Sequence, residues 1–222
     1  PHGPTLRAFA RLGVPAALAI LVEVTSFTLM ALFIARLGTT AAAAHQIAAN
    51  VAALLYMAPL SLAVAASARV SHWRGAGDEA RAGRLALQCF RAAALAGLAL
   101  AAIVFIARPW IAGIYTGQPG VALLAARLLA WVALYHVADA AQTVAVFVLR
   151  CWRVTLALLV VYGVLLWGVG LAGGYLLAYH GLGPLAARHA PTAFWQGAAG
   201  ALLLAAAAMG AMLHRVAGRA AR

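Results

Sequence analysis

The sequence has few charged residues, and almost none of them are acidic. Only 9% of the 222 residues are charged, and the acids are Glu23, Asp78, Glu79 and Asp139. A soluble domain is about a quarter charged and about half apolar, whereas 66% of this chain is hydrophobic. A water-soluble fold of this length could not remove so much apolar surface from water. The composition therefore excludes a soluble globular protein and predicts an integral membrane protein.

Lysine is absent, and cysteine is rare. All 16 basic residues are arginine, and the net charge is +12. In a membrane protein such an excess reflects arginine-rich cytoplasmic loops, so no nucleic-acid partner is expected. Cys89 and Cys151 both fall near predicted cytoplasmic span ends, where a structural disulfide is not expected. The motifs of phosphate-binding loops, nucleophile elbows and zinc peptidases are also missing. We therefore expect neither an enzyme nor a bound cofactor.

Six apolar stretches are each long enough to cross a bilayer, which takes roughly 20 residues in a helix. Alanine and leucine dominate them and β-branched residues are few, which favours helices over strands. We therefore predict an all-α membrane protein whose residues 1–222 form a single six-helix lobe. The predicted spans are 12–35, 41–68, 85–107, 121–149, 154–180 and 192–214.

The distribution of arginine predicts the orientation of these spans. With the amino terminus inside, twelve arginines fall on the inner side and four on the outer side, so both chain ends are expected in the cytoplasm. Asp78 and Glu79 fall in the basic inner loop, where a solvated pair is expected. The inner arginines are Arg7, Arg11, Arg69, Arg74, Arg81, Arg84, Arg91, Arg150, Arg153, Arg215, Arg219 and Arg222; the outer ones are Arg36, Arg108, Arg127 and Arg188.

Glu23 and Asp139 are predicted to lie at the same depth in the membrane. Glu23 follows Arg11 by 12 residues, and Asp139 precedes Arg150 by 11, which places them roughly 18 Å and 16–17 Å from the inner span ends. Keeping one acid near the middle of the bilayer costs about 2.5–3.5 kcal/mol, and no arginine is expected at that depth to offset it. Two such costs at matched depth predict a shared polar cavity.

Other polar residues accompany the two acids on three of the spans. On the fourth span, Trp131, Tyr135, Asp139 and Gln142 recur at helical spacing, so they share one face. Ser26 is one turn from Glu23, and Gln46 and Asn50 are one turn apart on the second span. Each of these neutral residues alone is typical of a bond between helices, worth about 0.6 kcal/mol. Burying the two acids costs more free energy than such hydrogen bonds contribute, so helix packing alone does not explain the acids. The oxygens of these carboxyl groups suit a proton or a hard monovalent cation.

Several runs of sequence resemble the carboxyl-terminal lobe of the multidrug and toxic compound extrusion (MATE) family, in its NorM-like branch. They extend over nearly the whole chain. The runs are Leu12-Gly13-Val14-Pro15, Glu23-Val24-Thr25-Ser26-Phe27, Ala43-Ala44-His45-Gln46-Ile47-Ala48 with Asn50, Met57-Ala58-Pro59-Leu60-Ser61, Tyr135-x-x-x-Asp139-x-x-Gln142, Leu149-Arg150, Trp167-Gly168-Val169-Gly170-Leu171 and Phe194-Trp195-Gln196-Gly197.

The resemblance implies one half of a twelve-helix, two-lobe antiporter in the bacterial inner membrane. Such a protein exports amphipathic, often cationic drugs in exchange for Na⁺ or H⁺. By similarity, Glu23, Asp139 and Tyr135 would bind the coupling cation, while Ser26, Gln46, Asn50 and Gln142 would line the polar cavity. The chain begins at Pro1 without an initiator methionine, so it is expected to be a fragment that pairs with an amino-terminal lobe. It departs from the family pattern at Cys151-Trp152-Arg153-Val154, where the family has a glycine and an aspartate.

Two alternatives remain open at the level of the sequence. A flippase for a lipid-linked sugar or a phospholipid would have a related fold, but it would favour basic residues in its cavity to meet phosphate. A truncated membrane scaffold without transport activity is the second alternative. The choice between Na⁺ and H⁺ is also open, since both suit a pair of carboxyl groups.

Overall fold

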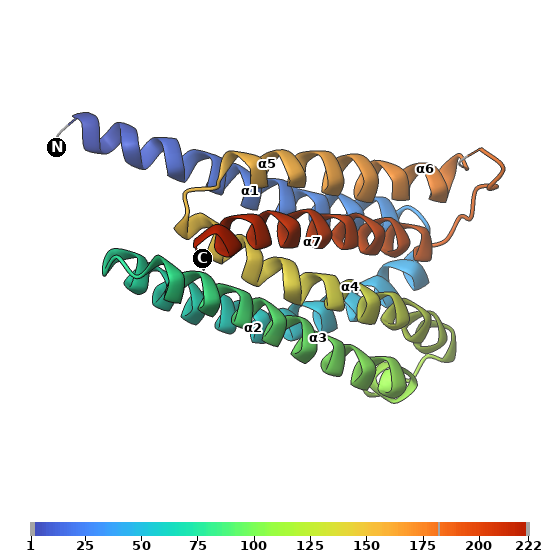
Figure 1. Cartoon of the computed structure of the whole chain (residues 1–222). Helices are drawn as coiled ribbons and strands as arrows, with labels where there is room; N and C mark the ends of the chain where they lie inside the picture. The colour runs from blue at the N-terminus through green and yellow to red at the C-terminus, as the bar shows by residue number, and fades with distance from the viewer. Residues whose placement is uncertain (1–2, 182, 221–222) are drawn as a thin grey trace.

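The computed structural model describes residues 3–181 and 183–220, which form a bundle of long antiparallel helices (Figure 1). Arg222, one of the predicted inner arginines, lies outside the described residues. Six helical segments in the described part are long and apolar enough to cross a membrane, which confirms the predicted fold class. The elements are α1 (Gly3–Ala35), α2 (Thr39–Gly75), α3 (Glu79–Tyr115), α4 (Pro119–Cys151), α5 (Leu156–Tyr162), the π-helix η1 (Gly163–Ala172), α6 (Gly173–Tyr179) and α7 (Thr192–Ala220).

Helices α2 and α3 extend well beyond the predicted spans, because the arginine-bearing turns that flank their apolar stretches are also helical. Each has 37 residues, or about 55 Å of helix. The residues that end the helices are those the sequence marks as turns. Gly38 precedes α2 with a φ of 109°, which favours glycine. Asp78 caps α3 by accepting a hydrogen bond from the Arg81 backbone N–H at 2.8 Å.

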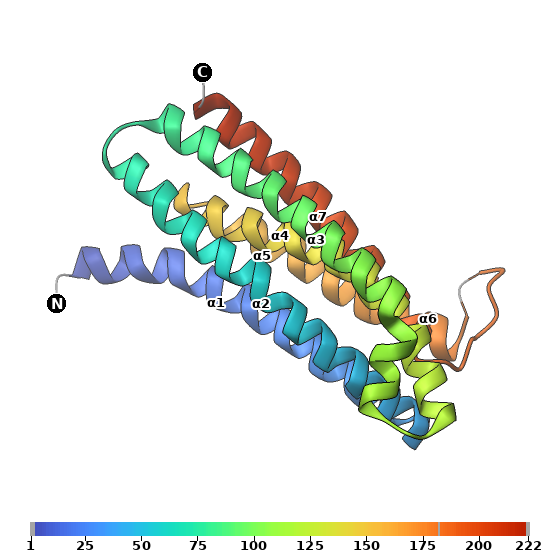
Figure 2. The same ribbon diagram turned by 90° about the horizontal axis from the view of Figure 1, so that it is seen from below.

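Helix α4 lies at the centre of the bundle and packs against α2, α3 and α7. Helix α1 contacts α2, α5 and η1, and its first turns extend away from the other helices, as Figure 2 shows. Both chain ends and the α2–α3 turn lie at one end of the bundle, which we call the arginine-rich end. The far end carries the α1–α2 and α3–α4 turns and the loop before α7. Because α4 is central, side chains on its different faces contact several other helices.

The η1–α6 segment approaches α7 closely because both carry glycine at the crossing. A Cβ on Gly197 would lie 2.6 Å from the Gly170 carbonyl oxygen and 3.0 Å from the Gly174 nitrogen. Real Cβ atoms do not approach so near, so the helices are in backbone contact here. The Gly170-x-x-x-Gly174 pattern thus serves helix packing, as small residues commonly do in membranes.

Glu79 joins the α2–α3 turn to the end of α4. Its carboxylate forms an ion pair with Arg74, at 2.9 Å between Oε1 and Nε, and accepts a hydrogen bond from Trp152 Nε1 at 3.2 Å. Arg74 also donates to the Cys151 carbonyl oxygen and lies over the Trp152 ring. The side chains of Asp78 and Glu79 remain 37% and 42% exposed, in agreement with a solvated pair in the loop, and in addition Asp78 caps a helix and Glu79 links two elements. Cys151 and Trp152, where the chain departs from the family pattern, belong to this contact.

Replacing Gly197 by alanine should destabilise the bundle by about 1–3 kcal/mol, because the added methyl overpacks a backbone contact. Thermal unfolding of the purified chain in detergent measures the effect. Gly200→Ala is the matched control on the same helix, where a Cβ meets nothing within 4 Å. Its stability should be unchanged or higher, since alanine favours a helix over glycine. Equal melting temperatures for the two variants would contradict the packing described above.

Candidate cation site in a mid-bundle cavity

The two predicted acids line one cavity of about 640 Å³. Glu23 reaches it from α1 and Asp139 from α4, and residues of α2 and α5 complete its wall. The lining combines two carboxyl groups, two amides and three tyrosine hydroxyls with an otherwise mostly apolar surface. Its polar members are Glu23, Asn50, Tyr56, Tyr135, Asp139, Gln142, Thr143, Arg150 and Tyr162.

Asp139 is held in a buried network of hydrogen bonds. It is 3% exposed, and its Oδ1 accepts from Gln142 Nε2 at 3.1 Å and from Thr143 Oγ1 at 3.5 Å. Gln142 in turn accepts at Oε1 from the Tyr162 hydroxyl of α5. A tight contact with α3 fixes this stretch of α4, because a Cβ on Gly97 would lie 2.5 Å from that of Ala140. The network therefore orients one carboxylate oxygen and leaves Oδ2 without a side-chain hydrogen-bond partner among the described residues.

Glu23 is partly exposed on the facing helix, α1. It also lines a second, small chamber of about 30 Å³ together with Ser26, Phe27 and Tyr135. Glu23, Phe27 and Tyr135 line both spaces, so the two adjoin. No hydrogen bond of the Glu23 carboxylate is found in the described part of the chain. Its oxygens are thus available to a cation or to a proton.

Tyr135 stands at an aromatic junction between the two chambers. Its ring packs edge-on against Phe27, at 6.1 Å between centroids, and against Trp195, at 5.8 Å. Phe27 and Trp195 also pack edge-on against each other at 5.9 Å. Edge-to-face pairs of this kind have a preferred geometry and add to packing. The junction fixes the ring, so that the Tyr135 side chain lines the same wall as Asp139, one turn along α4.

The neutral polar residues take different places. Asn50 lines the main cavity, as expected, whereas Gln46 lies outside its wall and donates to Asn50 Oδ1 from Nε2 at 3.2 Å. Ser26 lines only the small chamber, and its hydroxyl donates to the Val22 carbonyl oxygen at 2.7 Å. Gln142 is on the cavity wall. Trp131 lines surface grooves near the far end instead, because one more turn carries it past the cavity.

Arg150 also lines the main cavity, so an arginine shares the space of the two acids, contrary to the expectation that none lies near them, although no ion pair joins it to either acid in the described structure. Its Cα belongs to the last turn of α4, but its side chain packs over the Phe147 ring, at 5.3 Å from the guanidinium carbon. Its Nε is buried without a hydrogen-bond partner in the described structure. A long basic side chain can place its charge well away from its Cα. The cavity thus holds three ionisable side chains of opposite kinds, two acidic and one basic.

Four polar residues of the cavity were not anticipated from the sequence: Tyr56, Thr143, Arg150 and Tyr162. Tyr162 and Tyr56 are single phenols within apolar spans, a weak signal that lone interfacial tyrosines share. Thr143 follows Asp139 by four residues on α4, so helical spacing does place the two side chains side by side, and this spacing is the signal that could have found it. Arg150 was assigned to the membrane boundary because the position of an arginine Cα does not fix where its guanidinium lies.

Carboxylate, amide and phenol oxygens from several helices suit a proton or a hard monovalent cation. Within residues 3–181 and 183–220, no group of three or more histidine, cysteine, aspartate or glutamate side chains could hold a metal ion. With both acids ionised and Arg150 charged, the three side chains sum to one negative charge. A single monovalent cation would neutralise them.

Comparisons with known proteins give consistent results. The MatE family profile matches residues 15–176. Over 218 residues the chain is 36% identical to a probable multidrug resistance protein NorM of Aromatoleum aromaticum, covering 97% of the chain and 46% of that protein. It is 37% identical over 201 residues to the multidrug resistance protein MdtK of Pectobacterium atrosepticum, covering 89% and 43%. The chain thus spans less than half the length of these relatives.

Solved structures share the fold. The eukaryotic MATE transporter AtDTX14 superposes with a TM-score of 0.83 at 23% identity, covering 96% of this chain and 48% of that one. The Vibrio cholerae MATE transporter VcmN in its bent form gives a TM-score of 0.83 at 18% identity, covering 99% and 48%. The six-helix arrangement therefore matches about half of each of these chains.

The hydrogen-bond network around Asp139 predicts different effects for two cavity tyrosines. Tyr162→Phe removes the hydroxyl that donates to Gln142 and should cost about 0.5–1.5 kcal/mol of stability. Tyr56→Phe is the matched control, since no hydrogen bond from its hydroxyl is found among the described residues. Thermal unfolding in detergent compares the two. If Tyr56→Phe destabilised the chain as much as Tyr162→Phe, the network would not be what holds Gln142.

Proposed function

Since the chain belongs to the MatE family, we propose that it is the carboxyl-terminal lobe of a multidrug antiporter driven by a Na⁺ or H⁺ gradient. Glu23 and Asp139 would bind the coupling cation, and the Tyr135 hydroxyl would complete its coordination. Asn50 and Gln142 would line the surrounding cavity. The transported compounds would be amphipathic and often cationic, and an amino-terminal lobe would supply the other half of the drug-binding space.

The single observation that carries this proposal is the meeting of two carboxyl groups on one cavity wall. They come from α1 and α4, two helices far apart in the sequence. Acids within membrane spans are costly, and they commonly mark ion pathways and substrate sites. A buried carboxylate also needs a proton or a cation as its partner, which is the elementary requirement of a coupled transporter.

Competition for the same negative charge would couple the two flows. A cationic drug and the coupling cation are both attracted by the ionised acids, so each would lower the affinity of the site for the other. The two affinities would fall by the same factor. Arg150 limits the charge of the site to one negative unit, so one monovalent ion suffices to discharge it. Release of a drug on cation entry then needs no second ion.

The charge balance of the cavity argues against the flippase alternative. A phosphate-bearing lipid would meet two acids and a single arginine there, an unfavourable match for an anion. Tight binding of a lipid-linked pyrophosphate, without binding of a cationic dye, would favour that alternative. The scaffold alternative predicts no transport under any condition, including co-expression with an amino-terminal lobe. We also propose that the protein resides in a bacterial inner membrane with the arginine-rich end in the cytoplasm.

Removing the two acidic charges should abolish transport. In the two-lobe transporter expected to contain this chain, Glu23→Gln combined with Asp139→Asn should eliminate gradient-driven efflux of ethidium from cells, while the protein level on immunoblots stays normal. Asp78→Asn is the matched control, because asparagine caps a helix as well as aspartate and the residue lies outside the cavity. Full efflux by the double variant would refute the assignment of the cation site.

Replacing Arg150 by glutamine should strengthen cation binding and slow turnover. Without the guanidinium the two carboxylates lose their fixed counter-charge, so the coupling cation should bind severalfold tighter and leave more slowly. Cation-dependent efflux rates over a range of Na⁺ and H⁺ concentrations measure both effects. Arg153→Gln is the control, since that neighbouring arginine does not line the cavity. An unchanged cation dependence in Arg150→Gln would exclude this electrostatic role.

A further inference from the structure

We propose that a groove at the far end of the bundle binds an anionic phospholipid, with its phosphate headgroup at Arg108 and Arg127 and an acyl chain between α3 and α4. This site is separate from the mid-bundle cavity, and it concerns the lipid surroundings of the protein rather than its cargo. Two adjoining grooves carry the inference: one is basic, and the other is apolar.

The basic groove has a volume of about 710 Å³ and is bordered by α3, α4 and the start of α7. Arg108 and Arg127 contribute two guanidinium groups from different helices, and Thr192 and Gln196 add a hydroxyl and an amide. The rest of the lining is apolar, with Trp131 the largest member. Arginine pairs of this kind suit phosphate oxygens, because a guanidinium presents several N–H donors in one plane.

The two arginines have no acidic partner among the described residues. All four acids of the sequence are described: Glu23 and Asp139 line the mid-bundle cavity, while Asp78 and Glu79 lie in the α2–α3 turn at the opposite end. Both ion pairs found in the described structure belong to that turn. Arg108 donates from Nη1 to the Phe105 carbonyl oxygen at 2.8 Å, which holds the guanidinium at the groove while leaving its other donors available. The positive charge of Arg108 and Arg127 can therefore be neutralised by an anion from outside the chain.

An apolar groove of about 590 Å³ continues from the basic one along α3 and α4. The two share Ala130 and Trp131 in their walls, so they are contiguous. Every residue that lines the second groove is apolar, from Phe105 beside the arginines to Val137 deeper along α4. Val137 follows Arg127 by ten residues, or about 15 Å of helix, which is roughly half of a ~30 Å hydrocarbon layer. The length of the two grooves along α4 is therefore comparable to the depth of one leaflet.

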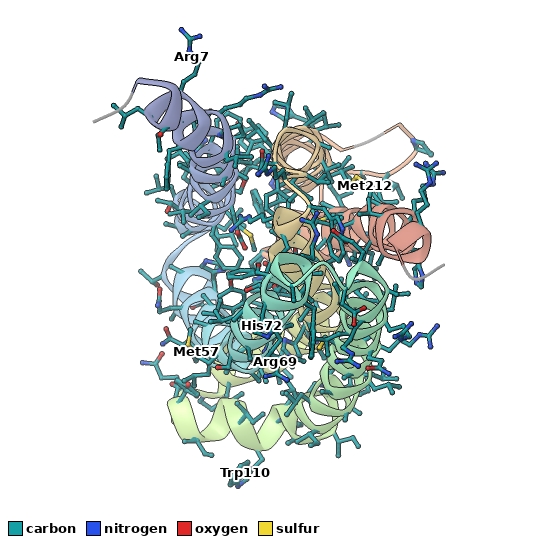
Figure 3. The ribbon with its side chains drawn as sticks, turned by 60° about the vertical axis from the view of Figure 1, so that its left-hand side comes forward. Arg7, Met57, Arg69, His72, Trp110 and Met212 are labelled. Atoms are coloured by element: carbon teal, nitrogen blue, oxygen red, sulfur yellow. The ribbon has the colours of Figure 1, made fainter. Side chains whose placement is uncertain are left out.

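The position of the grooves fits the membrane boundary. Trp110, two residues beyond Arg108, is 71% exposed and points away from the neighbouring helices in Figure 3. The segment that carries it lies across the direction of the other helices there. Exposed tryptophan is typical of the headgroup region. A phosphate at Arg108 and Arg127 would thus lie at headgroup level, with its chain directed inward. A cationic drug would be repelled by the same two charges.

Lipid binding to the purified 222-residue chain tests the proposal. Native mass spectrometry in detergent would compare retention of phosphatidylglycerol with that of phosphatidylcholine, and a separate titration would use inorganic phosphate alone. The variants are Arg108→Gln, Arg127→Gln and their combination. Arg36→Gln is the matched control, since Arg36 lies at the same end but packs over Tyr179, outside both grooves.

We expect phosphatidylglycerol to bind more tightly than phosphatidylcholine, with about a fivefold loss for each single variant and about a 30-fold loss for the double variant. Ala102→Phe, which fills the apolar groove from an exposed position, should weaken lipid binding without affecting phosphate binding. Arg36→Gln should bind as the parent does. Equal retention of the two lipids, or losses in Arg36→Gln equal to those of the double variant, would overturn the proposal. If inorganic phosphate bound with the same affinity as phosphatidylglycerol, the proposed binding of an acyl chain in the apolar groove would be refuted.

Every variant in this test lies outside the cavity wall, at a position that does not contact Glu23 or Asp139 in the hydrogen bonds and ion pairs of the described structure. The lipid measurement therefore succeeds or fails independently of whether the cavity exchanges cations for drugs. A melting-temperature measurement of each variant in detergent shows that the chain is folded. A folded double variant with undiminished phosphatidylglycerol retention would refute the site directly.

Discussion

The constraint on which the structure depends is the cost of keeping Glu23 and Asp139 inside a bundle of membrane-length helices. A buried carboxylate must find donors or counter-charges within the protein. Asp139 meets this need through Gln142 and Thr143 of its own helix, and the Tyr162 hydroxyl holds Gln142 from α5. Glu23 instead faces the cavity with its oxygens unpaired by the described residues. One acid is thus fixed and the other is available, an asymmetry that suits a site where a small cation enters and leaves.

The packing of the bundle serves this arrangement. Helix α4 carries Tyr135, Asp139, Gln142 and Arg150, and its central position lets one helix present all of them to the cavity. Close approach of neighbouring helices fixes α4 and α7 in place, through Gly97 against Ala140 and Gly197 against Gly170. These contacts use backbone and methyl groups, because lipid supplies little hydrophobic force to bring helices together and close van der Waals contact must do so.

The two ends of the bundle differ in how their arginines are neutralised. At the arginine-rich end, Asp78 and Glu79 pair with Arg81 and Arg74, and Trp152 completes a contact that joins the α2–α3 turn to α4. At the far end the described structure offers no acid to Arg108 or Arg127. The same scarcity of acids that identifies the cavity therefore leaves a basic groove, and its apolar continuation between α3 and α4 is the feature for which we propose a lipid anion as the ligand.

The sequence by itself determined the membrane class, the six helices and the two acids of the cavity. Hydropathy over about 20 residues and the cost of intramembrane charge act locally, so they can be read along the chain. Only the tertiary structure decided that Gln46 lies outside the cavity wall beside Asn50, that Ser26 lines a separate chamber and that Trp131 lines surface grooves instead of the cavity. It also decided that Tyr162 and Arg150 reach Gln142 and the cavity. These outcomes depend on the crossing of helices and on long side chains whose tips lie far from their Cα atoms, and no spacing within a single helix encodes either.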